Sequence, residues 1–125
     1  MIGLIGSGNM ASAIARGWGD PVLCTDAFPE RARALAQELG GEAVEGNGAL
    51  ADRAEVVLLC HKPAQLEEVA AQVGGRAKAI VSILGGVPLA KIRAAYEPYG
   101  APPIVRVLPS TPVEVRQGVT VHALD

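Results

Sequence analysis

A glycine-rich turn near the start of the chain constrains the fold more than any other feature. Gly6, Gly8 and Ala11 form the pattern Gly-x-Gly-x-x-Ala, between a short apolar run over 2–6 and an Ala- and Ile-rich stretch over 9–18. In such a turn the first glycine permits the tight bend, the second lets the backbone approach a pyrophosphate, and the small third residue lets the helix pack on the sheet. The position after a strand and before a helix predicts a nucleotide-binding turn, and a purely structural turn is the alternative.

The rest of the chain alternates short β-rich runs with helical ones. Continuous apolar runs such as 55–60 are typical of parallel strands buried on both faces. The alternation predicts an α/β fold: a Rossmann-like, doubly wound, mostly parallel sheet with helices on both faces, in a single domain over 1–125. The predicted strands are 2–6, 21–25, 42–44, 55–60, 79–84, 104–108 and 118–123, and the predicted helices or helical turns are 9–18, 29–39, 47–51, 63–73, 88–96 and 112–115.

An acidic residue follows the second predicted strand. Asp26 lies 20 positions after Gly6, where a carboxylate can accept hydrogen bonds from the adenine-side ribose hydroxyls. The same charge would repel the 2′-phosphate of NADPH, which favours NADH slightly, although Arg31 can reach the site from the next helix. An ordinary turn aspartate is the alternative. The residues expected to bind cofactor at this end are Gly6, Ser7, Gly8, Asn9, Met10, Asp26 and Ala27.

Composition narrows the class of partner. The net charge is −2 and aromatic residues make up only 3%, so the basic, aromatic surface of a nucleic-acid platform is not expected. No apolar run approaches the roughly 18 residues of a membrane helix, and the start of the chain does not resemble a secretory signal. Cys24 and Cys60 lie in separate apolar stretches, so we expect two reduced thiols, no metal site and a cytoplasmic protein.

Four segments resemble pyrroline-5-carboxylate reductases. They are the opening Ile-Gly-Leu-Ile-Gly-Ser-Gly-Asn-Met, the His-Lys-Pro over 61–63, the Ser-Ile-Leu-Gly-Gly-Val over 82–87 and the Val-Arg-Val-Leu-Pro-Ser-Thr-Pro over 105–112. Together they span the whole chain, and the last is specific. The resemblance implies that a hydride from NAD(P)H reduces the imine of Δ1-pyrroline-5-carboxylate to L-proline.

The resemblance also implies the nicotinamide end of the site. Lys62, Ser110 and Thr111 would be catalytic, and His61, Lys62, Pro63, Leu84, Gly85 and Gly86 would contact the cofactor. All lie at carboxyl ends of predicted strands, where open α/β sheets bind ligands. A solvated loop is the alternative for Lys62.

The chain departs from the family's pattern at several positions. Ser110 replaces an Asn, Leu108 a Met, Leu84 a small Ala and His61 a small apolar residue. His61 is either a proton donor to the substrate nitrogen or a side chain at a strand end. The family's helical second domain, which builds the dimer and holds substrate, does not appear within these residues. We therefore expect this chain alone to bind cofactor, turn over little, and self-associate weakly through exposed apolar surface.

Two other functions remain open. The first is a different oxidoreductase on the same scaffold, such as a deazaflavin-dependent NADP reductase. The second is a nucleotide-binding module that has lost the chemistry, because fold alone does not settle function.

Overall fold

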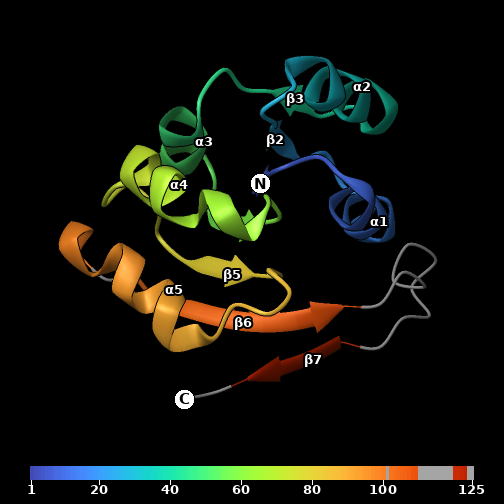
Figure 1. The fold of residues 1–125 in the computed structure, drawn as a ribbon. Helices are drawn as coiled ribbons and strands as arrows, with labels where there is room; N and C mark the ends of the chain where they lie inside the picture. Colours follow the sequence, from blue (N-terminus) through green and yellow to red (C-terminus); the bar gives the residue numbers. More distant parts are fainter. Residues whose placement is uncertain (101, 110–119, 124–125) are drawn as a thin grey trace.

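A computed structural model describes residues 1–100, 102–109 and 120–123 and shows one sheet of seven strands (Figure 1). The strand order is β3-β2-β1-β4-β5-β6-β7. The first six strands pair in parallel, and β7 pairs antiparallel with β6. The predicted mostly parallel, doubly wound sheet is therefore confirmed. The strands are β1 (Ile2–Ile5), β2 (Leu23–Thr25), β3 (Glu42–Ala43), β4 (Val56–Leu59), β5 (Ile80–Ser82), β6 (Ile104–Pro109) and β7 (Thr120–Ala123).

Helices cover both faces of the sheet. Figure 1 shows α3, α4 and α5 grouped together and α1 and α2 grouped apart from them. The α-helices are α1 (Asn9–Trp18), α2 (Pro29–Leu39), α3 (Asn47–Arg53), α4 (Leu66–Val73) and α5 (Leu89–Tyr96), and two 3₁₀ turns are η1 (Pro63–Gln65) and η2 (Glu97–Tyr99). Among the described residues, no helix combines the length and apolar character needed to cross a bilayer.

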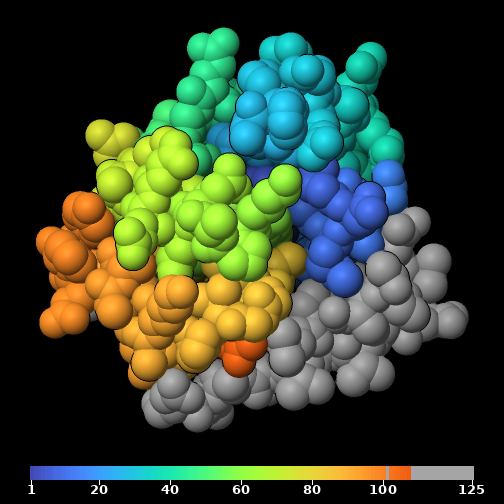
Figure 2. Space-filling model, in the orientation of Figure 1, coloured from blue at the N-terminus to red at the C-terminus, as the bar shows by residue number. Residues whose placement is uncertain are grey.

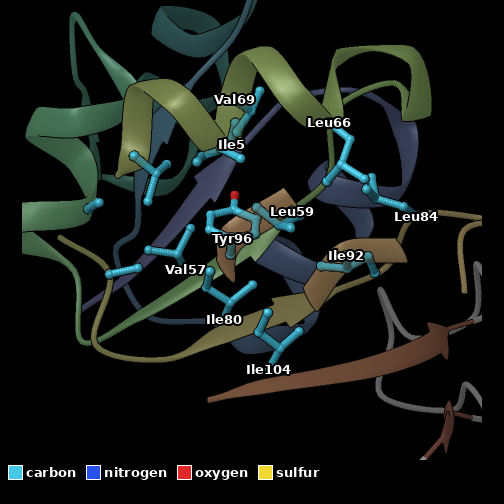
Figure 3. Packing of buried hydrophobic residues seen from close by; sticks show 14 of the residues in the cluster. Ile5, Val57, Leu59, Leu66, Val69, Ile80, Leu84, Ile92, Tyr96 and Ile104 are labelled. Carbon is cyan, nitrogen blue, oxygen red and sulfur yellow. The ribbon is translucent and has the colours of Figure 1, made fainter. Parts of the chain in front are cut away.

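The sheet separates two hydrophobic clusters. Val57 and Leu59 of β4 belong to the cluster under α3, α4 and α5, and Leu58 belongs to the cluster under α1 and α2. Because successive strand side chains point to opposite faces, this explains why the run is apolar throughout. Figure 3 shows Tyr96 of α5 inside the first cluster, among residues of β1, β4 and α4.

Several element boundaries differ from the predictions. The helix predicted over 63–73 begins as the 3₁₀ turn η1, because Gln65 N–H bonds back to the Lys62 carbonyl, and becomes α-helical only at Leu66. The turn predicted over 47–51 is a helix that continues to Arg53, and η2 was not predicted. The helical turn predicted over 112–115 lies outside the described residues.

Candidate functional site

The turn after β1 packs tightly against the end of β4. Gly6 has φ +101°, and a Cβ atom there would lie 2.6 Å from the carbonyl oxygen of Cys60. Glycine is therefore required twice, once for its backbone conformation and once for the close approach of two loops. Cys60 itself is inert, because burial raises the pKa of its thiol to about 12. This contact joins the carboxyl ends of β1 and β4 into one surface.

Gly8, two residues further on, borders open space. It is the N-cap of α1, and a Cβ there would meet no atom of residues 1–100, 102–109 or 120–123 within 4 Å. Among the described residues no side chain caps this helix end, so its first N–H groups lack the partners that a capping residue would provide. Free N–H groups and the positive end of the helix dipole form a cradle for a phosphate group.

The carboxylate of Asp26 connects the glycine turn to the end of β2. Its Oδ2 accepts a hydrogen bond from Ser7 N at 2.8 Å, and its Oδ1 accepts one from Phe28 N at 3.0 Å. Ser7 is buried and donates its hydroxyl to the carbonyl of Thr25 at 3.0 Å, so this hydroxyl is committed to the turn. Each carboxylate oxygen retains a lone pair for a further donor. Asp26 therefore positions the turn and still presents acceptors.

A cleft of about 1160 Å³ lies over the carboxyl ends of β1, β2 and β4. In Figure 2, α2 in cyan and α4 in yellow-green, which both contribute residues to the lining of this cleft, lie on the visible face. Of the predicted site residues, the cleft is lined by Gly6, Ser7, Gly8, Asp26, Ala27, His61 and Lys62. A smaller cleft beside it is lined by Ser7, Gly8, Asn9, Ser12 and Arg31. Met10 and Pro63 line neither cleft.

His61 follows β4 and has a defined tautomer. Its Nδ1 lies 2.8 Å from the carbonyl oxygen of Lys62, and because a carbonyl only accepts, Nδ1 carries the proton. Nε2 is buried and has no partner within the described part of the chain. Burial also lowers the pKa of the imidazole, which favours the neutral form. In that form Nε2 is a hydrogen-bond acceptor rather than a proton donor.

The next loop along the chain begins at Lys62. The exposed Lys62 lines the large cleft, and its N–H donates to Oε1 of Gln65 at 3.2 Å. Together with the Gln65 N–H bond to the Lys62 carbonyl, this closes η1 reciprocally. The backbone of the loop is thus fixed while the ammonium group reaches solvent.

The residues after β5 are arranged differently. Leu84 is only 2% exposed and packs in the hydrophobic cluster with α4 and α5, while its N–H donates to Oγ of Ser82. Gly85 and Gly86 are exposed and line neither of the two clefts. Ser110 and Thr111 lie outside the described residues. The structure thus brings most of the predicted residues that follow β1, β2 and β4 together at the clefts, and it leaves the predicted residues after β5 at a separate strand end.

Sequence reasoning missed two features of the cleft wall. Asn47, at the start of α3, accepts a hydrogen bond from the Thr25 hydroxyl and donates to Oε1 of Gln72 at 2.6 Å. Phe28 is 51% exposed, and the Arg31 guanidinium lies 4.7 Å from its ring centroid. An aromatic residue two positions after Asp26 was the available sequence signal for the contact of Phe28 with Arg31. The hydrogen bonds of Asn47 depend on contacts between elements that are distant in the sequence.

The family model described as NADP oxidoreductase, coenzyme F420-dependent, matches residues 1–86. The chain belongs to this family of NAD(P)-binding oxidoreductases. Within curated proteins it is similar to pyrroline-5-carboxylate reductases, which confirms the resemblance found in the sequence. It is 34% identical to that of Pseudomonas aeruginosa, over 95% of this chain and 46% of the relative, and 32% identical to that of Aquifex aeolicus, over 94% and 45%.

Solved structures of the same enzymes share the fold. The reductase from Coxiella burnetii aligns with a TM-score of 0.83 at 28% identity, over 97% of this chain and 48% of that one. The Plasmodium falciparum reductase, whose structure has NADP bound, aligns with a TM-score of 0.83 at 21% identity, over 99% and 47%. The second likeness shows the fold alone. This chain spans about half the length of the relatives it matches.

Proposed function

We propose that this chain is the cofactor-binding domain of an NAD(P)H-dependent imine reductase that reduces Δ1-pyrroline-5-carboxylate to L-proline. The observation that carries the proposal is the turn at Gly6–Gly8, open at Gly8 and held to the end of β2 by Asp26. The proposed reaction is that of the curated relatives, because the proteins that align with this chain are pyrroline-5-carboxylate reductases.

The chain's own residues fit a nicotinamide dinucleotide. The N–H groups at the start of α1 would bind the pyrophosphate beside Gly8, where a ligand finds open space. Asp26 would accept hydrogen bonds from the adenine-side ribose through its remaining lone pairs, which favours NADH slightly. NADP bound to the Plasmodium falciparum reductase supports use of the phosphorylated cofactor by this fold as well.

The residues around the nicotinamide are assigned from the resemblance to pyrroline-5-carboxylate reductases. When bound, the reduced nicotinamide would supply the hydride that the imine carbon accepts, and the ring nitrogen of the substrate would take its proton from solvent. Lys62, Ser110 and Thr111 would face the substrate, while His61, Pro63 and the backbone of Leu84–Gly86 would border the ring. The role of these groups would be to orient the reacting atoms and exclude water. This chain alone would then bind cofactor but turn over slowly or not at all. Assembly into a homo-oligomer is compatible with this role.

Calorimetric titration with NADH and with NADPH tests the proposal. We expect saturable binding of both, and absence of binding for both would contradict it. A steady-state assay with Δ1-pyrroline-5-carboxylate should then show little or no turnover by this chain. Normal turnover would contradict the expectation of an incomplete site while supporting the reaction itself. Binding without turnover even when a helical second domain of the reductase family is supplied would favour a non-catalytic nucleotide-binding module.

A second function is favoured by the description of the matching family model. A coenzyme F420-dependent NADP oxidoreductase would transfer hydride between a deazaflavin and NADP. Incubation of the protein, with a helical second domain of the reductase family supplied, with NADPH and oxidised F420 distinguishes the two functions, because reduction of F420 would bleach its visible absorbance. We expect no bleaching, and oxidation of NADPH only when Δ1-pyrroline-5-carboxylate is present.

A further inference from the structure

A chain of side-chain hydrogen bonds crosses one wall of the large cleft. The Thr25 hydroxyl, at the end of β2, donates to Oδ1 of Asn47, and Nδ2 of Asn47 donates to Oε1 of Gln72 at 2.6 Å. Asn47 begins α3 and Gln72 is in the last turn of α4, and these two helices lie side by side (Figure 1). All three residues line the large cleft, and none lines the small cleft beside the glycine turn. The hydrogen bonds therefore join β2, α3 and α4 at one wall of the large cleft.

Thr25 connects these bonds to the glycine turn. Its carbonyl oxygen accepts hydrogen bonds from the Gly6 N–H at 2.9 Å and from the Ser7 hydroxyl at 3.0 Å. Thr25 is only 5% exposed, so its own hydroxyl needs a partner within the protein, and Asn47 is that partner. The position of the Asn47 oxygen is thus fixed relative to the turn.

Gln72 holds the other end of the Asn47 amide. The oxygen and nitrogen of a side-chain amide have nearly the same shape, so its orientation is set by the partners that contact each atom. The described residues use one of the two lone pairs of the Asn47 oxygen and one of the two N–H groups of its nitrogen. Gln72 is exposed, so packing of the core does not require its bond to Asn47. Asn47 therefore retains one acceptor and one donor, in a fixed orientation, for a ligand in the cleft.

We propose that Gln72 is a positioning residue for cofactor binding and acts through Asn47. Together with Thr25, it holds the Asn47 amide so that the remaining donor and acceptor meet the adenosine half of NAD(P)H in the large cleft. The inference rests on the proposed function and deepens it, because the adenosine half of the cofactor then extends from the glycine turn past Asp26 over the end of β2. Gln72 does not need to touch the cofactor, so its effect on affinity requires an intact Asn47.

The first test compares Gln72→Leu with Gln37→Leu by calorimetric titration with NADH. Gln37 is an exposed glutamine of α2 that lines neither cleft, so the second variant is a control for the same chemical change. Gln72→Leu should weaken NADH about fivefold, which corresponds to one hydrogen bond, and Gln37→Leu should change the affinity less than about twofold. Gln72→Glu retains an acceptor for Asn47, so it should restore most of the affinity at high salt, where the added charge is screened.

Titration with ADP-ribose locates the contact within the cofactor. ADP-ribose has the adenosine and both phosphates of NADH and lacks the nicotinamide. Gln72→Leu should therefore weaken ADP-ribose and NADH by the same factor. A loss of affinity for NADH without a loss for ADP-ribose would place the effect at the nicotinamide end and overturn the inference.

A double-mutant cycle distinguishes a positioning role from a general structural one. In an Asn47→Ala background, Gln72→Leu should have little further effect on NADH affinity, because the group that Gln72 positions is absent. If Asn47→Ala does not fold, Asn47→Asp takes its place, since it keeps an acceptor for Thr25 and lacks the donor to Gln72.

Two results would overturn the inference while leaving the proposed function intact. One is an unchanged NADH affinity in Gln72→Leu, and the other is a loss of affinity that is as large in the Asn47 variant as in the unmodified chain. If the unmodified chain binds neither NADH nor NADPH, the proposed function itself fails.

Discussion

The two ends of the candidate site are constructed very differently. At the glycine turn, backbone N–H groups, Asp26 and the close contact of Gly6 with Cys60 fix three strand ends against one another. At the end of β5, Leu84 is in the core and Gly85 and Gly86 are exposed, and a Cβ at either glycine would have no atom of the described residues within 4 Å. The difference teaches that the turn after β1 is organised by contacts among the described residues, whereas the loop after β5 has few such contacts. Under the proposed function, the first region would anchor the cofactor and the second would border the place of chemistry.

The largest expected effect is on stability and compares the closely packed turn at Gly6 with the exposed loop after β5. Gly6→Ala should lower the free energy of unfolding by about 3 kcal/mol, because φ is +101° and the new Cβ would collide with the Cys60 carbonyl. Gly85→Ala is the matched control and should change it by less than about 0.5 kcal/mol. Urea unfolding followed by circular dichroism measures both, and equal effects would abolish the distinction between the two ends.

A second substitution separates the stability of the glycine turn from its proposed binding of the cofactor. Gly8→Val places a side chain where the described residues leave space, at a backbone conformation of the β region. The free energy of unfolding should therefore change by less than about 1 kcal/mol. The same side chain would occupy the approach to the N–H groups of α1, and NADH affinity should fall at least about tenfold. Calorimetry on the folded variant decides the matter, and unchanged affinity would show that the pyrophosphate does not lie at Gly8.

Asp26→Asn tests how much the hydrogen bonds of Asp26, which link the ends of β1 and β2, contribute to stability and to cofactor affinity. One carboxamide oxygen replaces two carboxylate acceptors, so Ser7 N or Phe28 N loses its charge-assisted partner. The free energy of unfolding should fall by about 1 kcal/mol, and NADH should bind more weakly. A variant with full stability and full affinity would show that Asp26 is an ordinary turn residue.

The smallest expected effect concerns pH. Burial lowers the pKa of His61 in the folded chain below its ordinary value of 6.5, so the folded state favours the neutral ring. Its contribution to stability is present above pH 6.5 and is lost as pH falls from there through the folded pKa, because the unfolded chain binds the proton more readily. His61→Gln should flatten the dependence of unfolding on pH in this window, and an unchanged slope would assign it to another group.

The local sequence pattern was sufficient to predict most of the helices and strands. The apolar runs and the Gly-x-Gly-x-x-Ala turn predicted the described strands and the helices over 9–18 and 29–39, because period and turn chemistry are properties of short segments. Boundaries were less certain, since the switch from 3₁₀ to α geometry at Leu66 depends on the Gln65 side chain. Assignments at Ser110 and Thr111 stay predictions.

The sequence by itself determined that this chain forms a doubly wound sheet with a nucleotide-binding turn and that it resembles pyrroline-5-carboxylate reductases. Only the tertiary structure decided that Asp26 holds the turn, that Leu84 packs in the core, and that Arg31 stacks on Phe28. Residues such as Asp26 and Ser7 are 19 positions apart, and their contact exists only because parallel strands bring their carboxyl ends to the same edge of the sheet.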